Sequence, residues 1–376
     1  MWYQRFFEKN LATNLLTGKV FVLYGLRRAG KTSLIQKFLS TYTGKYFLGT
    51  GEDLPLREIF ESQSVSRIKS SFGGYDLIVI DEAQHIANIG LGLKMLIDHT
   101  PNLRVIASGS SSFDLSNKLG EPLTGRQRIR TLYPISMLEI KEQFGAMEII
   151  QHLDEFMIYG TFPEVLLLKN NNEKIEYLNT LRDSYLLKDL LILENVRNAN
   201  KLVQLLKLLA FQIGNEVSLN ELSNSLGLSK HTISRYLDLL EKVFIIKRVG
   251  GFSRNLRNEI TKTCRYYFLD NGIRNALINN FNQLDSRDDV GKLWENFMFA
   301  ERLKRNTYKH HFANYYFWRT YSRQEIDFVE EYGGKLFGYE FTWGKKTKKA
   351  PRLWLETYKN SSFVVINKDN FLEFVC

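Results

Sequence analysis

The feature that most constrains the fold is a glycine-rich segment that directly follows a short apolar run. Residues 25–32 read GLRRAGKT and fit the pattern GxxxxGK[ST]. The preceding run, KVFVLYG at 19–25, is rich in β-branched and aromatic residues, which is typical of a buried strand. A helix is predicted from Lys31 to about Leu39. A strand, a glycine-rich loop and a helix in this order predict a loop that surrounds phosphate groups.

This phosphate loop predicts a site for ATP with Mg²⁺. Its glycines let the backbone curve so that several N–H groups face the phosphates. We expect the Lys31 ammonium to reach the β- and γ-phosphates and the Thr32 hydroxyl to bind Mg²⁺. The alternative is a glycine-rich turn with a chance lysine, and the two loop arginines either touch phosphate or face solvent. The residues expected to line the nucleotide are Gly25, Arg28, Ala29, Gly30, Lys31, Thr32 and Ser33.

Two acidic residues, Asp81 and Glu82, follow the apolar segment YDLIVI at 75–80. In an open parallel sheet, ligands bind beyond the carboxyl ends of the strands. We therefore expect Asp81 to hold Mg²⁺ and Glu82 to orient and activate the attacking water. The alternative interpretation of this pair is a helix N-cap.

Two further groups are candidates for contact with the γ-phosphate. A serine-rich segment follows the fourth predicted strand, and either Ser108 or Ser110 is expected to act as a sensor of the γ-phosphate or the water, unless the serines only form a turn. The segment EPLTGRQRIR at 121–130 offers three arginines, of which Arg126 is the first candidate for stabilising transition-state charge. A solvated arginine cluster is the alternative.

The order of elements predicts an α/β fold with several domains. Strands are also predicted at 44–51 and 103–110, and helical segments separate all four. Alternating strands and helices indicate a parallel sheet covered by helices. The chain of 376 residues is too long for one core, so more than one domain is expected. The predicted units are a P-loop domain at 1–135, a helical region at 136–265 and a mixed α/β domain at 266–376.

The middle region carries the pattern of a winged helix-turn-helix over residues 218–249. Gly227 ends the first helix and Ser229 caps the second. Two wing strands are predicted around Gly250–Gly251. The second helix either enters a DNA groove or serves protein packing or as a lid of the ATPase. The DNA-binding candidates on its outward face are Lys230, His231, Thr232 and Arg235.

The last domain places acidic residues on a helix and on two successive strands. Such residues can gather around one Mg²⁺. Their order resembles PD-(D/E)xK nucleases, in which a lysine follows two residues after the last acid. Here that position holds Thr342, and Lys345 or Lys346 lies farther along. We expect a nuclease-like fold with a degenerate site, and an active nuclease or an unrelated fold are the alternatives. The acids are Glu295, Asp327 and Glu340.

The net charge and the hydropathy of the sequence indicate which kinds of partner the protein has. The net charge of +10 suits contact with nucleic acid or another acidic partner. The first residues have no continuous apolar segment, which is not the pattern of a signal peptide, and no run has the ~18 apolar residues of a membrane span. We expect a soluble, cytoplasmic protein without a membrane partner.

Several motifs together resemble a group of bacterial and archaeal AAA+ ATPases that join a P-loop ATPase to a helix-turn-helix and a nuclease-like domain. The matching motifs are YGLRRAGKTSL, VIDEAQHI, SGSSSFDLS, EPLTGR, YPISMLE, YGTFPEVLL, YFLDNGIRNAL, WENFMFAERL, and EIDFV with YEF. The resemblance implies Walker A roles for Lys31 and Thr32, Walker B roles for Asp81 and Glu82, and an arginine finger at Arg126. Such fingers act in cis or in trans, so the oligomeric state stays open.

These observations favour an ATP-driven switch or motor that acts on double-stranded DNA or on a DNA-bound partner. A signalling ATPase with a protein partner and an ATP-regulated nuclease are the alternatives. The resemblance implies no particular cellular process.

Overall fold

The chain folds into two compact units in the computed structural model, which describes residues 2–109, 122–183, 199–254, 263–344 and 348–376. The first unit is Trp2–Pro134 with Lys242–Phe244, and the second is Ile135–Glu241 with Ile245–Cys376. Three units were predicted, with a boundary near residue 265. The structure has no boundary there, because strands from both sides of that residue pair in one sheet.

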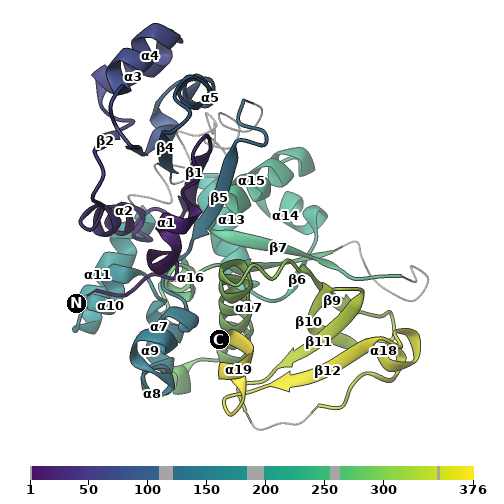
Figure 1. The fold of residues 1–376 in the computed structure, drawn as a ribbon. Helices are drawn as coiled ribbons and strands as arrows, with labels where there is room; N and C mark the ends of the chain where they lie inside the picture. The colour runs from purple at the N-terminus through teal and green to yellow at the C-terminus, as the bar shows by residue number, and fades with distance from the viewer. Residues whose placement is uncertain (1, 110–121, 184–198, 255–262, 345–347) are drawn as a thin grey trace. The chain divides into compact units, whose positions relative to one another are not determined.

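A parallel five-stranded sheet forms the centre of the first unit, in the order β2-β3-β4-β1-β5 (Figure 1). Its first four strands lie where the sequence predicts them. The fifth was not predicted as a strand, because its sequence QRIRTL has only two apolar residues and it lies at the sheet edge. The strands are β1 (Val20–Gly25), β2 (Tyr46–Thr50), β3 (Leu77–Asp81), β4 (Arg104–Gly109) and β5 (Gln127–Leu132).

Helices cover this sheet and complete its core. Phe60, Phe72 and Leu93 pack with the buried side chains of β1, β3 and β4 in one apolar cluster. The N-terminal segment before β1 has two short helical elements, which together extend from residue 8 to 14. The elements are η1 (Glu8–Asn10), α1 (Leu11–Asn14), α2 (Lys31–Leu39), α3 (Leu54–Glu61), α4 (Val65–Phe72), η2 (Ala83–His85) and α5 (Ile89–His99).

The second unit begins with helices. A capping box between Ser136 and Glu139 starts the first of them. The helices are α7 (Met137–Phe144), α8 (Ala146–Gln151), α9 (Leu153–Tyr159), α10 (Pro163–Leu167), α11 (Asn171–Leu181), α13 (Ala199–Phe211), α14 (Leu219–Leu226), α15 (Lys230–Lys242), α16 (Asn271–Ile278), η4 (Leu284–Ser286), α17 (Val290–Tyr308), α18 (Arg352–Thr357) and α19 (Phe371–Val375). None of the helices described has the length and apolarity that crossing a membrane requires.

A seven-stranded sheet runs through the whole second unit, in the order β12-β11-β10-β9-β7-β8-β6. The hairpin predicted around Gly250–Gly251 is wrong. Both glycines lie inside β7, whose antiparallel partner is β8 and whose parallel partner on the other side is β9. The strands are β6 (Glu216–Val217), β7 (Ile246–Gly251), β8 (Cys264–Phe268), β9 (Asn314–Arg319), β10 (Glu325–Tyr332), β11 (Lys335–Phe341) and β12 (Ser361–Ile366).

Candidate functional site

The phosphate loop connects the end of β1 to the start of α2. Gly25 has φ +152°, and a Cβ on it would lie 2.0 Å from the Leu132 carbonyl oxygen at the end of β5. Only glycine fits such a close approach between two backbones. Gly30 lies in the left-handed region at φ +95° and immediately precedes α2. The backbone thus turns sharply at both glycines that the sequence pattern requires.

The Lys31 side chain is folded inward within this loop. It is 4% exposed, and its Nζ donates to the carbonyl oxygens of Gly25 at 2.9 Å and Leu26 at 3.0 Å. Burial lowers the pKa of Lys31 to about 8, although Glu82 and Asp81 act in the opposite direction. The ammonium is therefore held among carbonyl groups, and a phosphate would offer it a stronger partner.

Thr32 and Ser108, which were predicted from two other motifs, both contact Asp81. The Thr32 hydroxyl donates to Asp81 Oδ2 at 2.6 Å, and the Ser108 hydroxyl donates to Asp81 Oδ1. These side chains come from α2, β3 and β4, at the carboxyl edge of the parallel sheet. A threonine hydroxyl and a carboxylate are oxygen ligands that suit Mg²⁺. The other predicted sensor, Ser110, lies outside the described residues.

The side chain of Glu82 is held by a neighbour that the sequence analysis did not single out. Its carboxylate accepts a hydrogen bond from the Gln84 amide, and its backbone is left-handed at φ +49°. The end of β2 closes over the same backbone, since a Cβ on Gly51 would lie 2.3 Å from the Glu82 carbonyl oxygen. The motif DEAQ contains the signal, because an amide two residues after an acid can hold its carboxylate.

A buried arginine from the N-terminal segment fixes the phosphate loop. Arg5 is 2% exposed, and its Nη1 and Nη2 donate to the carbonyl oxygens of Ala29 at 2.5 Å and Tyr133 at 2.6 Å. One guanidinium thus joins the loop to the residue that follows β5. The sequence analysis missed this residue, because no local pattern predicts the partners of a single arginine.

The structure corrects the interpretation of Arg126. This residue precedes β5, whose register pairs Gln127 with Val20 and Leu132 with Gly25. At ~3.3 Å per residue, Arg126 lies about 20 Å along the strand from the phosphate loop. Its Nε donates instead to Asp98 Oδ1 at 3.0 Å. The prediction that it reaches the γ-phosphate of its own chain is therefore wrong, and action on a neighbouring copy stays a prediction.

The other two arginines of this segment lie farther along the same edge strand. Arg128 and Arg130 each donate to Asn14 Oδ1 at 3.2 Å. The two guanidinium groups are close, and the pKa of Arg130 is lowered by burial and by Arg128. They form a local pair on β5 rather than part of the phosphate loop.

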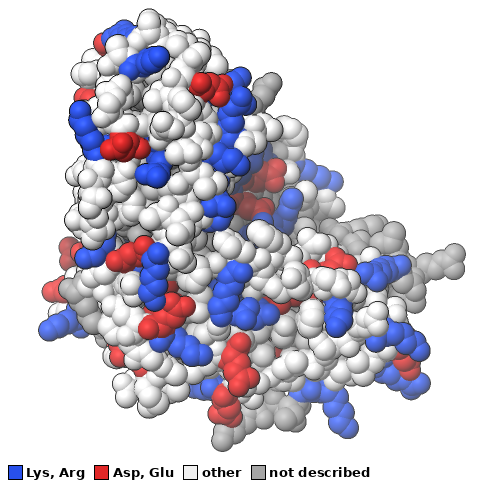
Figure 2. Space-filling view, viewed as in Figure 1, with Lys and Arg blue, Asp and Glu red and all other residues white. Residues whose placement is uncertain are grey.

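The DNA-binding candidates lie at the start of α15. Lys230, His231 and Arg235 are exposed, whereas Thr232 is half-buried and its N–H donates to the Ser229 hydroxyl at 3.1 Å in the helix cap. On the face drawn in Figure 2, Lys and Arg side chains are scattered among Asp and Glu. The positive net charge is thus not gathered into a single block on that face.

The three acids of the C-terminal domain come together in the second unit. Glu295 lies on α17, Asp327 on β10 and Glu340 on β11, and all three are buried. Arg265 of β8 forms ion pairs with Glu295 at 3.2 Å and with Asp327 at 3.5 Å. Lys348 forms an ion pair with Glu340.

The sequence analysis named two lysines that could replace the missing nuclease lysine, and the structure shows a third one beside the cluster. The Thr342 hydroxyl, in the position where the nuclease pattern has lysine, donates to the Gly344 carbonyl oxygen at 3.2 Å. Lys345 and Lys346 lie outside the described residues. Lys348, which the sequence analysis did not propose, is the lysine that pairs with Glu340.

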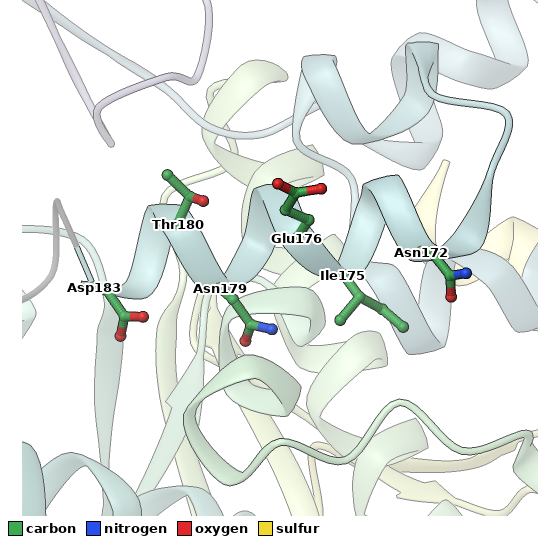
Figure 3. A pocket seen from close by; sticks show the side chains of 6 residues that line it. All are labelled: Asn172, Ile175, Glu176, Asn179, Thr180 and Asp183. Atoms are coloured by element: carbon green, nitrogen blue, oxygen red, sulfur yellow. The ribbon is translucent and has the colours of Figure 1, made fainter.

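A groove of about 570 Å³ lies along α11 and is lined by none of the predicted site residues (Figure 3). Among the described residues its lining contains two acids and no cation, which does not suit nucleotide phosphates. The side chains are Asn172, Ile175, Glu176, Asn179, Thr180 and Asp183.

Comparison with known families supports the assignment of the first unit. Residues 17–141 match the family described as AAA domain, and this range holds the phosphate loop, Asp81, Glu82 and all five strands of the parallel sheet. The first unit is thus similar to P-loop ATPase domains of the AAA type. Residues 150–284 and 290–374 match two different domains of unknown function. Together these two matches cover most of the residues that follow the AAA-domain match.

Two relatives match this chain over most of its length and most of their own. An uncharacterized protein of Methanocaldococcus jannaschii is 26% identical over 344 residues, which cover 86% of this chain and 74% of that protein. An uncharacterized protein of Haemophilus influenzae is 27% identical over 314 residues, 77% of this chain and 75% of its own. A Walker-type ATPase of Pyrococcus abyssi shares the fold, with a TM-score of 0.52, 18% identity, and coverage of 74% of this chain and 96% of that one.

Proposed function

We propose that this chain binds ATP with Mg²⁺ and hydrolyses it at the phosphate loop of the AAA-type domain. The observation that carries this proposal is the meeting of the Thr32 and Ser108 hydroxyls on the two oxygens of Asp81. Three strands or helices of the domain place oxygen ligands at one point beyond the sheet edge. This arrangement suits a hydrated Mg²⁺ beside nucleotide phosphates.

Each residue has a separate part in the proposed reaction. Lys31 exchanges its carbonyl partners for the β- and γ-phosphates, and Thr32 and Asp81 hold the metal ion. When bound, Mg²⁺ supplies charge neutralisation on the phosphate oxygens. Glu82 orients a water and accepts its proton as the water oxygen bonds to the γ-phosphorus and the bond to the β-phosphate oxygen breaks. Ser108 keeps Asp81 in position.

We further propose that the second unit passes nucleotide-dependent changes to double-stranded DNA. The proposal of a winged helix-turn-helix is supported by the element order α13, β6, α14, α15, β7, β8, with Gly227 left-handed at φ +63° in the turn between α14 and α15. Such a module reads DNA with the start of its second helix. Lys230, His231 and Arg235 lie there and are exposed.

A protein partner is the second candidate, and one observation favours it. The strand that would form a free wing, β7, is paired on both sides, with β8 and with β9. Of the residues that the structure describes in this module, the exposed start of α15 is then the surface proposed for a groove contact. Two other proposals are compatible with either a DNA partner or a protein partner. One is that the last domain resembles PD-(D/E)xK nucleases, and the other is that Arg126 acts on a neighbouring copy.

The test of this proposal is ATP hydrolysis measured with and without duplex DNA. We expect Mg²⁺-dependent hydrolysis in the wild type, its loss in Glu82→Gln, and stimulation by duplex at low salt. No hydrolysis in the wild type would contradict the enzymatic proposal, and hydrolysis that is indifferent to DNA would favour the protein partner.

A pair of matched variants tests the DNA surface itself. The double substitution Lys230→Ala and Arg235→Ala removes two charges from α15, whereas Lys169→Ala and Lys359→Ala remove two exposed charges elsewhere on the same unit. Each lost phosphate contact lowers the slope of log affinity against log salt by about 0.9. We therefore expect a slope smaller by roughly 2 in the first variant and an unchanged slope in the second. Equal slopes in both variants would remove α15 from the DNA interface.

A further inference from the structure

The acidic cluster of the second unit is the one place besides the phosphate loop where the sequence predicts a metal ion. Glu295, Asp327 and Glu340 are 3%, 7% and 2% exposed. A metal-dependent nuclease of this type would direct carboxylate oxygens at a shared divalent ion and leave space for a phosphate group and a water. The partners of these oxygens therefore decide whether the cluster can hold an ion.

An arginine stands between two of the three carboxylates. Arg265 is 3% exposed, and its Nη1 lies 3.2 Å from Glu295 Oε1 and 3.5 Å from Asp327 Oδ1. Burial by itself lowers the pKa of Arg265, but the neighbouring Tyr267, Glu295 and Asp327 raise it above its ordinary value. The guanidinium is thus a permanent cation at the point where both acids would contact a metal ion.

The remaining oxygens of the cluster also have partners. Glu295 accepts from the Tyr267 hydroxyl at 2.7 Å and from Lys292 Nζ at 3.0 Å. Asp327 Oδ2 accepts from the Phe341 N–H at 3.0 Å, and Lys348 pairs with Glu340. Across the described ranges, no group of three or more His, Cys, Asp and Glu side chains has an arrangement that could hold a metal ion.

Two of the groups that close the cluster, Arg265 and Gly214, lie outside the predicted domain at 266–376. Arg265 and Tyr267 are alternate residues of β8, and so they project from the same face of that strand. Gly214 lies between α13 and β6 at φ +68°, and a Cβ there would come within 3.0 Å of Glu295 Oε2. Lys292 donates to the Gly214 carbonyl oxygen at 3.1 Å as well as to Glu295. The helix-turn-helix region thus covers Glu295 with backbone and side chains.

We infer that Arg265 takes the place of the divalent cation in this cluster, which is a closed ion-pair core joining β8 to α17 and β10 and does not bind Mg²⁺ or cleave nucleic acid. A divalent ion placed among these acids would meet the guanidinium at a few ångströms, where like charges in a poorly solvated site repel strongly. The residues present do not fit the metal ion that the nuclease resemblance implies. Removal of Arg265 takes away the guanidinium that Glu295 and Asp327 share and lets these two acids accept a divalent ion.

The first experiment measures Mn²⁺ binding to the full-length protein without nucleotide, by isothermal titration and by the electron paramagnetic resonance signal of free Mn²⁺. We assign to the acidic cluster only binding that is lost in Asp327→Asn and retained in Asp81→Asn. The inference predicts no such binding in the wild type. Binding that meets both conditions would overturn it, and this experiment requires no variant of Arg265 to fold.

The second experiment exchanges the arginine for an uncharged side chain of similar length. Arg265→Met should gain Mn²⁺ binding, so that Mn²⁺ raises its melting temperature by several degrees while leaving that of the wild type unchanged. The double variant Arg265→Met with Asp327→Asn should lose this response, and Arg265→Lys, which keeps a cation, should not show it. A folded Arg265→Met protein that ignores Mn²⁺ would contradict the view that the arginine occupies the ion's place.

The absence of nuclease activity is measured separately from ATP hydrolysis. Plasmid DNA incubated with the wild type and Mn²⁺ should remain uncut, and Asp327→Asn should hydrolyse ATP at the wild-type rate. Cleavage that disappears in Asp327→Asn would overturn the inference while leaving the proposed ATPase untouched. A wild type that neither hydrolyses ATP nor binds Mn²⁺ at the cluster would contradict the ATPase and support the closed core.

Discussion

The proposed nucleotide site around Asp81 and the C-terminal acidic cluster both place carboxylates where the sequence predicts Mg²⁺, and they differ in what surrounds those carboxylates. The oxygens of Asp81 accept hydrogen bonds from the hydroxyls of Thr32 and Ser108. The oxygens of Glu295 and Asp327 face a buried guanidinium. A neutral hydroxyl can share a metal ion with the carboxylate, whereas a cation competes with the ion. The neighbours of an acid, more than the acid itself, decide whether it binds metal.

The strongest way to break this comparison is Glu82→Gln. The substitution keeps the shape of the side chain and removes its ability to accept a proton. We expect the rate of ATP hydrolysis to fall about 10²–10⁴-fold with nucleotide affinity preserved. The measurement is steady-state hydrolysis together with binding of a fluorescent ATP analogue. A comparable fall on Asp327→Asn would mean that the two acidic sites do not have separate roles.

Stability should separate the two sites as well. Arg265→Met removes the buried guanidinium that Glu295 and Asp327 share, and we expect it to lower the free energy of unfolding of the second unit by about 3–5 kcal/mol. Asp81→Asn keeps an oxygen for one of the two hydroxyls, and so it should change the stability of the first unit by no more than about 1 kcal/mol. Urea unfolding with a separate probe for each unit measures both. Equal losses would contradict the distinction between a functional and a structural carboxylate.

The pH dependence of ATP binding sharpens the view of the phosphate loop. The pKa of Lys31 is lowered by burial to about 8 without nucleotide, and bound phosphates raise it. Above pH 8, binding therefore requires uptake of a proton, and affinity should fall as pH rises, approaching about tenfold per pH unit. Below pH 8 the ammonium is already charged, and affinity should be flat with respect to this group. Titrations in buffers of different ionisation enthalpy detect the proton.

Lys31→Arg is the matched control for this pH profile, because a guanidinium stays charged throughout the range. Whatever its absolute affinity, the variant should show no fall between pH 8 and 10. The same fall in Lys31→Arg would assign the pH dependence to another group.

The smallest expected effect concerns Gln84. Its amide holds the carboxylate of Glu82, and a hydrogen bond to a charged group contributes about 1.5–3 kcal/mol. Water can replace part of the hydrogen bond that the carboxylate loses. We therefore expect Gln84→Met to lower the turnover rate by about tenfold or less while leaving nucleotide affinity unchanged. Gln84→Asn, a shorter amide, is the control. A change in affinity with an unchanged turnover rate would show that Gln84 acts on the loop and not on Glu82.

Local sequence patterns predicted the elements that local physics determines. Strands β1 to β4 are buried or flanked by turn signals, and the phosphate loop has fixed spacing, so both could be recognised. The edge strand β5 could not, because its polar side chains are compatible with a loop. The register of β5 then placed Arg126 near the amino ends of the strands, whereas the phosphate loop lies at their carboxyl ends.

Long-range contacts account for what the sequence could not predict. The pairing of β7 with β9 brings residue 250 to residue 316, which turned a predicted wing hairpin into a central strand. Arg5 reaches Tyr133 across 128 residues of sequence, and Arg265 reaches Asp327 across 62. No local periodicity encodes such partners. The three acids were recognised from their order along the chain, but the cation that closes them lies in a segment assigned to another domain.

The most direct test of this account is Mg²⁺-dependent ATP hydrolysis compared in the wild type, Asp81→Asn and Asp327→Asn. The account predicts that the wild type hydrolyses ATP, that Asp81→Asn loses both the activity and its dependence on Mg²⁺, and that Asp327→Asn retains the wild-type rate and Mg²⁺ requirement. Retention of activity in Asp81→Asn, or its loss in a folded Asp327→Asn protein, would contradict it.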